Sequence, residues 1–164
     1  MRLSVITDEL SQDFATAAEL LSDWGIRNVE LRTLFYRRVP DLTDAQIREI
    51  IQTTKQFNLN IVAISPGLFK LDLRDEKGVE EHLKERLPRS IALAKALEVN
   101  LIIAFTPHVS KNIHDIEQCI NLLATATDAC SEEGITLAIE NEPGHFADTG
   151  KNTASLIRAV GKST

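Results

Sequence analysis

Acidic and imidazole side chains gather in one segment of the sequence. Glu140 directly follows the apolar run Thr136-Leu137-Ala138-Ile139, and Glu142 and His145 lie within the next five residues. A carboxylate at the end of a buried strand is costly unless a cation, a basic partner or a bound substrate compensates it. Carboxylate and imidazole ligands suit Mg²⁺, Mn²⁺ or Zn²⁺, depending on the full ligand set. The segment therefore predicts a functional site, and the alternative is a solvated rim.

A second group of polar residues follows other apolar runs. Glu30 and Arg32 are two residues apart, which places both side chains on one face of a strand. We expect them to pair with each other or to hold a substrate oxygen, and a purely structural ion pair is the alternative. Ser65 and His108 also stand just beyond apolar runs, where they are candidate substrate contacts.

The elements that must position these residues are short apolar segments alternating with longer helical ones. The pattern predicts about five sequential βα units. Several of the strand segments are almost entirely apolar, as in parallel strands that are covered on both faces. The expected strands are Leu3–Thr7, Asn28–Arg32, Asn60–Ser65, Asn100–Phe105 and Thr136–Asn141. Functional groups of such folds gather at the carboxyl ends of the strands, where the candidates above lie.

Start and stop signals mark the helices between these strands. The segment Thr43-Asp44-Ala45-Gln46 has the pattern of a capping box, and Pro88 predicts a break within the helical stretch 79–97. Further helices are expected over 14–24, 113–130 and 153–160. His82 and His114 lie among charged helical residues and are expected at the surface.

The two cysteines are expected to be buried thiols rather than a disulfide. Cys119 and Cys130 lie on one predicted helix, eleven residues apart. A rise of about 1.5 Å per residue separates them by about 16 Å, whereas a disulfide needs Cα atoms within about 7 Å.

Composition limits the class of protein. The chain has 164 residues, with 18 basic and 24 acidic side chains and a net charge of −6. This balance disfavours non-specific binding to nucleic acid or to an anionic lipid surface. The longest apolar run, Leu101–Phe105, is far shorter than the ~20 residues of a membrane span. No targeting segment is apparent, so a cytoplasmic protein is expected.

Two architectures use repeated βα units, an open doubly wound sheet and a (β/α)₈ barrel. The length favours the open sheet, because a barrel typically needs about 250 residues. However, the first strand runs into Asp8-Glu9 instead of a glycine-rich loop, and these acidic side chains would repel a phosphate group. We therefore expect sequential strand order and a single partial TIM-barrel domain over residues 1–164. An open sheet with an acidic pocket at Asp8 and Glu9 would instead place the first strand centrally.

Three segments together resemble the xylose isomerase-like TIM-barrel superfamily, the group of sugar phosphate isomerases and epimerases. These segments are Ile6-Thr7-Asp8-Glu9, Gly25-Ile26 with Val29-Glu30-Leu31-Arg32, and Ile139-Glu140-Asn141-Glu142-Pro143-Gly144. The resemblance runs along the whole chain in order. It implies a barrel with a divalent metal (Mn, Mg, Zn or Co) at the carboxyl ends of its strands.

The resemblance also implies roles for individual residues. Glu140 matches the strand-five glutamate that is both a metal ligand and an acid/base group in isomerases and epimerases. The implied substrate is a small keto sugar or polyol, whose carbonyl lies beside the metal while a proton is moved. The expected substrate contacts are Glu30, Arg32, Ser65, Glu142 and His108.

The sequence departs from the family pattern in two ways. Strands six to eight and their metal ligands are absent, so we expect an N-terminal portion that is inactive alone and binds a metal only if the missing ligands are supplied. The endonuclease IV branch has histidines at the ends of strands three and four, where this chain has Ser65 and Phe105-Thr106. A sugar is therefore preferred over DNA. The remaining alternative is a non-catalytic βα protein that self-associates through its exposed sheet edges.

Overall fold

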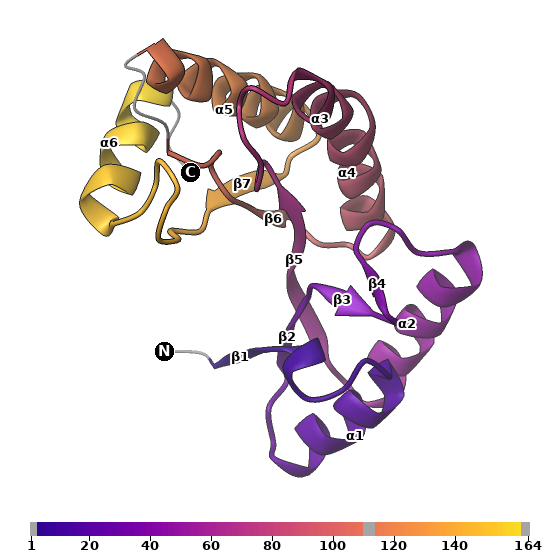
Figure 1. The fold of residues 1–164 in the computed structure, drawn as a ribbon. Helices are drawn as coiled ribbons and strands as arrows, with labels where there is room; N and C mark the ends of the chain where they lie inside the picture. The colour runs from indigo at the N-terminus through magenta and orange to yellow at the C-terminus, as the bar shows by residue number, and fades with distance from the viewer. Residues whose placement is uncertain (1–2, 110–113, 162–164) are drawn as a thin grey trace.

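The computed structural model describes residues 3–109 and 114–161, and five parallel strands form its central sheet (Figure 1). The strands are β1 (Ser4–Ile6), β2 (Asn28–Leu31), β5 (Asn60–Leu68), β6 (Leu101–Ala104) and β7 (Thr136–Ile139). They follow the order β1-β2-β5-β6-β7, each beside the next strand of the series. This order confirms the partial barrel. It rules out the doubly wound alternative, since β1 lies at an edge of the sheet.

Helices connect the strands and accompany them from α1 and α2 at one end of the series to α5 and α6 at the other (Figure 1). Their bounds are α1 (Phe14–Asp23), α2 (Asp44–Gln56), α3 (Glu76–Glu81), α4 (Leu87–Ala96), α5 (His114–Glu132) and α6 (Gly150–Val160). The predicted capping box is confirmed, because the Thr43 side chain accepts from the Gln46 N–H while Gln46 Oε1 accepts from the Thr43 N–H. Of the helix expected over 113–130, Ile113 lies outside the described residues.

The prediction of a break or a fresh start at Pro88 is confirmed only for the fresh start, because the backbone stays helical over residues 76–96. A π-helical turn (His82–Arg86) joins α3 to α4, and Pro88 lies in the first turn of α4. Proline has no N–H to donate to a carbonyl one turn earlier, and the wider turn before it accommodates this loss.

The hydrophobic core lies between the helices and one face of the sheet. In β2, Val29 and Leu31 are fully buried, whereas Glu30 between them is partly exposed. β6 repeats this alternation, with Ile102 buried and Ile103 partly exposed. The face that carries Glu30 therefore keeps access to solvent.

Both cysteines belong to this core. Cys119 and Cys130 are free and buried on α5, which confirms the expectation of buried thiols. Burial raises the pKa of Cys119 to about 12 and that of Cys130 to about 11, so both remain protonated and unreactive. Among the described helices, none is long and apolar enough to cross a membrane.

A short antiparallel hairpin between β2 and α2 was not predicted. It consists of β3 (Thr33–Leu34) and β4 (Arg37–Arg38), joined by Phe35 and Tyr36 with φ angles of 53° and 58°. Two-residue hairpin turns need such angles and usually contain asparagine or glycine. The turn Phe35-Tyr36 contains neither asparagine nor glycine, so the sequence does not predict a hairpin here.

His82 is not the surface residue that was expected. It is half-buried, and its Nδ1 accepts a hydrogen bond of 2.8 Å from the Phe69 N–H. Burial lowers the pKa of His82, and the neighbouring Arg86 lowers it further. The side chain of His114, the other histidine expected at the surface, lies outside the described residues.

Acidification is therefore expected to destabilise the protein through His82. Its folded-state pKa lies below the unfolded value of about 6.5, so the stability it contributes is present above that pH and is lost as the pH falls through the folded value. Melting temperatures measured between about pH 8 and about pH 5 test this. The wild type should lose more stability than His82→Gln, whose amide oxygen can still accept from Phe69. Parallel curves for the two proteins would contradict the assignment.

Candidate substrate site at the strand ends

Two glutamates, Glu30 and Glu140, lie toward the carboxyl ends of β2 and β7, which are separated in the sheet by β5 and β6. Glu140 directly follows β7, and its N–H donates to the Ala104 carbonyl of β6 over 2.9 Å, which fixes its backbone beside the sheet. Its side chain is exposed. Glu30 is on β2, and the pKa of its carboxyl is raised first by burial and next by the negative charge of Glu140. The two carboxylates are thus close enough to influence each other.

Arg32 does not pair with Glu30, which corrects the expectation from their spacing. Its guanidinium binds the carboxylate of Asp8 through two nitrogens, at 3.0 and 2.7 Å from Oδ2, and also binds Glu9. Asp8 accepts a further hydrogen bond of 3.1 Å from the Thr33 N–H. These contacts raise the pKa of Arg32, with Asp8 as the largest cause. The two acidic residues therefore do not form an open pocket; they hold the end of β2 to the 3₁₀ turn after β1 (Thr7–Glu9).

Arg38, which no sequence pattern indicates as a site residue, lies at the same strand ends. Its Nε donates to the Ser65 carbonyl over 3.2 Å, and its side chain is partly buried. Glu30 and Glu140 both act on its charge, so Arg38 belongs to the same cluster. Burial is nevertheless the largest influence, and it lowers the pKa of Arg38. The dipeptide Arg37-Arg38 gave no sign of this position, because the hairpin alone decides which arginine turns inward.

Ser65 is buried near the end of β5, where its carbonyl serves as the acceptor for Arg38. The next residue, Pro66, accepts a hydrogen bond of 3.0 Å from Arg86 Nε. Arg86 also binds Asp41 at 3.4 Å. Two arginines therefore hold the end of β5 against the hairpin and the loop that precedes α2.

Glu142 and His108 belong to a second cluster instead. Glu142 would share the face of Glu140 only if the strand continued that far, and β7 ends at Ile139. Glu142 binds Lys70 at 2.7 Å, which lowers its pKa, and its other carboxylate oxygen lies 3.8 Å from Nδ1 of His145. The exposed His108 stacks on His145 with ring centroids 4.4 Å apart.

His145 is the buried member of that second cluster. It is only 2% exposed, and neither ring nitrogen has a hydrogen-bond partner in the described structure. Burial lowers its pKa, and the neighbouring His108 lowers it further. A neutral, buried His145 therefore acts as a packing residue between His108 and Phe105.

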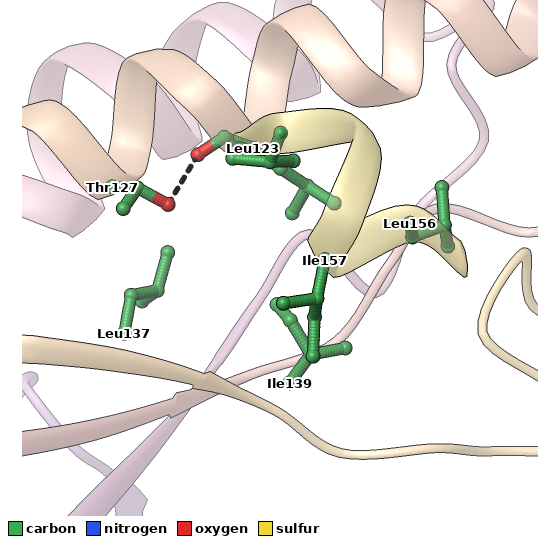
Figure 2. A pocket seen from close by; sticks show the side chains of 7 residues that line it. Leu123, Thr127, Leu137, Ile139, Leu156 and Ile157 are labelled. Atoms are coloured by element: carbon green, nitrogen blue, oxygen red, sulfur yellow. Dashed lines mark hydrogen bonds between the residues drawn. The ribbon is translucent and has the colours of Figure 1, made fainter. Parts of the chain in front are cut away.

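A small apolar cavity lies elsewhere, between α5, α6 and β7 (Figure 2). Its volume of about 20 Å³ is room for a single water. Its lining includes Leu123, Leu137 and Leu156. The hydroxyl of Thr127, which also lines it, already donates a hydrogen bond of 2.7 Å to the Leu123 carbonyl. The cavity is a packing gap and offers nothing to a polar ligand.

A metal-binding set is not complete within this part of the structure. Over residues 3–109 and 114–161, no group of three or more histidine, cysteine, aspartate or glutamate side chains is placed to hold a metal ion. Glu140 supplies one carboxylate at most, so the described residues do not by themselves fit a metal centre.

Comparison with solved structures shows which proteins share this fold. L-ribulose 3-epimerase matches with a TM-score of 0.74 and 19% identity over 99% of this chain and 58% of its own. D-psicose 3-epimerase, solved in the presence of D-fructose, matches with 0.75 and 18% over 99% and 61%. The IOLI protein, solved with a zinc atom, matches with 0.76 and 21% over 99% and 60%.

The chain thus spans about three fifths of the length of these proteins. A comparison with curated protein sequences finds no match. The family model described as xylose isomerase-like TIM barrel matches residues 18–164. That match covers most of the chain, and the sequential parallel strands agree with it. This chain belongs to the xylose isomerase-like TIM barrel family.

Proposed function

We propose that this chain forms the substrate-binding and proton-transferring part of a sugar isomerase or epimerase that acts on a small keto sugar or polyol. The observation that carries the proposal is the position of Glu30 and Glu140 toward the carboxyl ends of β2 and β7, where the charge of Glu140 contributes to raising the pKa of Glu30. Two neighbours in the fold comparison bear the names of sugar epimerases, which supports the same class of substrate.

Proton transfer is assigned to Glu140. Its exposed carboxylate stands at a fixed position at the sheet's end, where it can take a proton from a carbon next to a ketone and return it. Glu30, whose pKa is raised first by burial and next by Glu140, supplies a second carboxyl group that can form a hydrogen bond with a sugar hydroxyl. The buried Ser65 and its neighbour Arg38 complete this side of the site.

A divalent metal belongs to the proposal only with ligands from outside the described residues. The described part of the chain offers Glu140 and no complete set, although the IOLI protein was solved with zinc. When bound, such an ion (Mn, Mg, Zn or Co) would polarise the sugar carbonyl as a Lewis acid. Complete conversion of a sugar is expected only once those ligands are supplied, in keeping with a chain that is inactive alone. The exchange of a single proton next to the ketone needs only a positioned base, which Glu140 provides.

Deuterium exchange tests the proposal. The chain is incubated with D-psicose or L-ribulose in deuterium oxide, and proton NMR follows the signal of the carbon-bound hydrogen next to the ketone. We expect this signal to disappear faster with the protein than in buffer. An unchanged rate would exclude proton transfer at this site.

The alternative is a non-catalytic protein that self-associates. β1 pairs only with β2 and β7 only with β6 among the described strands, so both edges of the sheet have unpaired backbone groups. Sedimentation equilibrium distinguishes the two functions. A stable oligomer together with absent exchange would favour the structural alternative.

A further inference from the structure

Three arginines stand at the strand ends, and they differ in their partners. Arg32 binds Asp8 and Glu9, and Arg86 binds Asp41. Within the described chain, Arg38 takes part in no ion pair, and its one hydrogen bond runs from Nε to the Ser65 carbonyl. Its two terminal nitrogens are therefore free of protein partners in this part of the molecule.

The end of β5 is shaped to hold this guanidinium. Gly67 has a φ of +73°, and a Cβ added there would lie 2.9 Å from Arg38 Nε and 3.1 Å from Cζ. A side chain at this position would displace the arginine, so the glycine provides the space in which Arg38 lies. The Ser65 carbonyl fixes Nε from the same strand. The guanidinium is thus held from β5 while its outer edge stays unpaired.

A partly buried guanidinium without an anion is unfavourable. Burial, Arg32 and Arg86 all act against the charge of Arg38, whereas Asp8, Glu140 and Glu30 favour it, although none of these three carboxylates forms an ion pair with it. The outer edge of a guanidinium carries two parallel N–H donors, which match two oxygens of a carboxylate or a phosphate. A bound anion would satisfy these donors and the charge together.

The glutamates nearby restrict what kind of molecule can bind. Glu30 and Glu140 would repel a simple anion placed between them. A ligand that fits must therefore direct its acidic group toward Arg38 and its neutral hydroxyl and carbonyl groups toward the glutamates. An elongated sugar derivative with an acidic group at one end has this distribution of charge.

We propose that Arg38 binds the anionic end of the substrate, a carboxylate or a phosphate ester, so that this chain selects acidic sugars over neutral ones. The position of the remaining part of the substrate, beside the glutamates, depends on the function proposed above. The anion site itself depends only on Arg38 and the end of β5.

Calorimetric titrations of the chain in buffer with EDTA test this inference without any bound metal. The probes are D-fructose, D-fructose 6-phosphate and 2-keto-D-gluconate. The phosphate ester or the keto acid should bind about 10-fold or more tightly than D-fructose, because hydrogen bonds to charged groups are the stronger ones. The tighter of the two acidic probes identifies the anion as phosphate or carboxylate.

Arg38→Gln should abolish this preference. Arg37→Gln is the matched control, because it removes the same charge from the exposed neighbouring residue of the same strand and should keep the preference. Arg38→Lys keeps the charge without the paired donors and should retain only part of the preference, which preserves the test if the glutamine variant folds poorly. Circular dichroism establishes that each variant is folded.

Three results would overturn the inference: equal affinity for D-fructose and both acids, absence of binding by both acids at millimolar concentration, or an unchanged preference in Arg38→Gln. If Arg37→Gln lost the preference for acidic probes as fully as Arg38→Gln, the preference would come from the net charge of the protein and not from a site at Arg38, which would also overturn the inference. The deuterium-exchange experiment on the wild type separates this inference from the proposed function. If the wild type fails to exchange protons but keeps a preference that depends on Arg38, the anion site stands and the catalytic proposal falls.

Discussion

Replacing Glu140 by glutamine is expected to slow the exchange of the substrate proton by a factor of about 10² to 10⁴, the usual contribution of a positioned general base. Glutamine keeps the size of the side chain and leaves the hydrogen bond from the residue 140 N–H to the Ala104 carbonyl intact. It has no basic oxygen that can take a proton from carbon. The substitution therefore removes the chemistry while it preserves the strand end.

The measurement is the rate of deuterium incorporation into D-psicose with equal concentrations of wild type and variant. Glu132→Gln is the matched control, because Glu132 is an exposed carboxylate on α5. This control should exchange at the wild-type rate. Equal rates for wild type and Glu140→Gln would show that Glu140 is not the base.

Replacing Asp8 by asparagine is expected to reduce the free energy of unfolding by about 2–3 kcal/mol. Asp8 has a side chain that is 7% exposed, and it binds Arg32 through two nitrogens and the Thr33 N–H. Asparagine keeps one acceptor oxygen and loses the charge that compensates the half-buried guanidinium. Glu9 remains as a partner of Arg32, which keeps the loss below that of a fully unpaired buried charge.

Urea unfolding followed by circular dichroism measures this loss. Asp72→Asn is the control, because Asp72 and its partner Arg74 form an exposed pair. Exposed pairs contribute about 0–1 kcal/mol, so this variant should remain close to the wild type. If Asp8→Asn lost no more stability than Asp72→Asn, the contacts of Asp8 would not be what holds the ends of β1 and β2 together.

The succession of elements was predictable from the sequence because burial leaves a periodic pattern. Each of the five expected strand segments coincides with an observed strand, although β5 runs three residues beyond its expected end. Local chemistry alone located the capping box at Thr43 and the position of Pro88 in the first turn of α4. The expected last strand ran two residues too far. It ends at Ile139, since the chain turns away there and Glu142 reaches Lys70 instead.

The partners of the charged residues were not predictable in the same way. Spacing predicted Glu30 and Arg32 on one strand face, but it could not show that Asp8 and Glu9 would bind the arginine from the turn after the neighbouring strand β1. The position of Arg38 depends on the register of a hairpin. A shift of one residue there would exchange it with Arg37 and move the guanidinium to the opposite face.

The burial of histidines was missed for a similar reason. The charged neighbours of His82 predict an exposed helix, but the end of β5 folds back so that Phe69 donates to its ring. His145 is buried because an antiparallel bridge pairs it with His108, a contact between segments far apart in the sequence. Local patterns carry no information about such contacts.

The most direct test of the proposed sugar site is to locate the bound sugar by NMR. The ¹⁵N-labelled chain is titrated with D-psicose and with D-fructose 6-phosphate, and the backbone amide resonances are followed. Saturable shifts are predicted at the carboxyl ends of the strands, at Glu30, Ser65 and Glu140, with Asn60 and Thr136 at the opposite ends unchanged. Absent shifts, or shifts confined to Asn60, Thr136 and the outer helices, would contradict the proposal that this chain binds sugars at its strand ends.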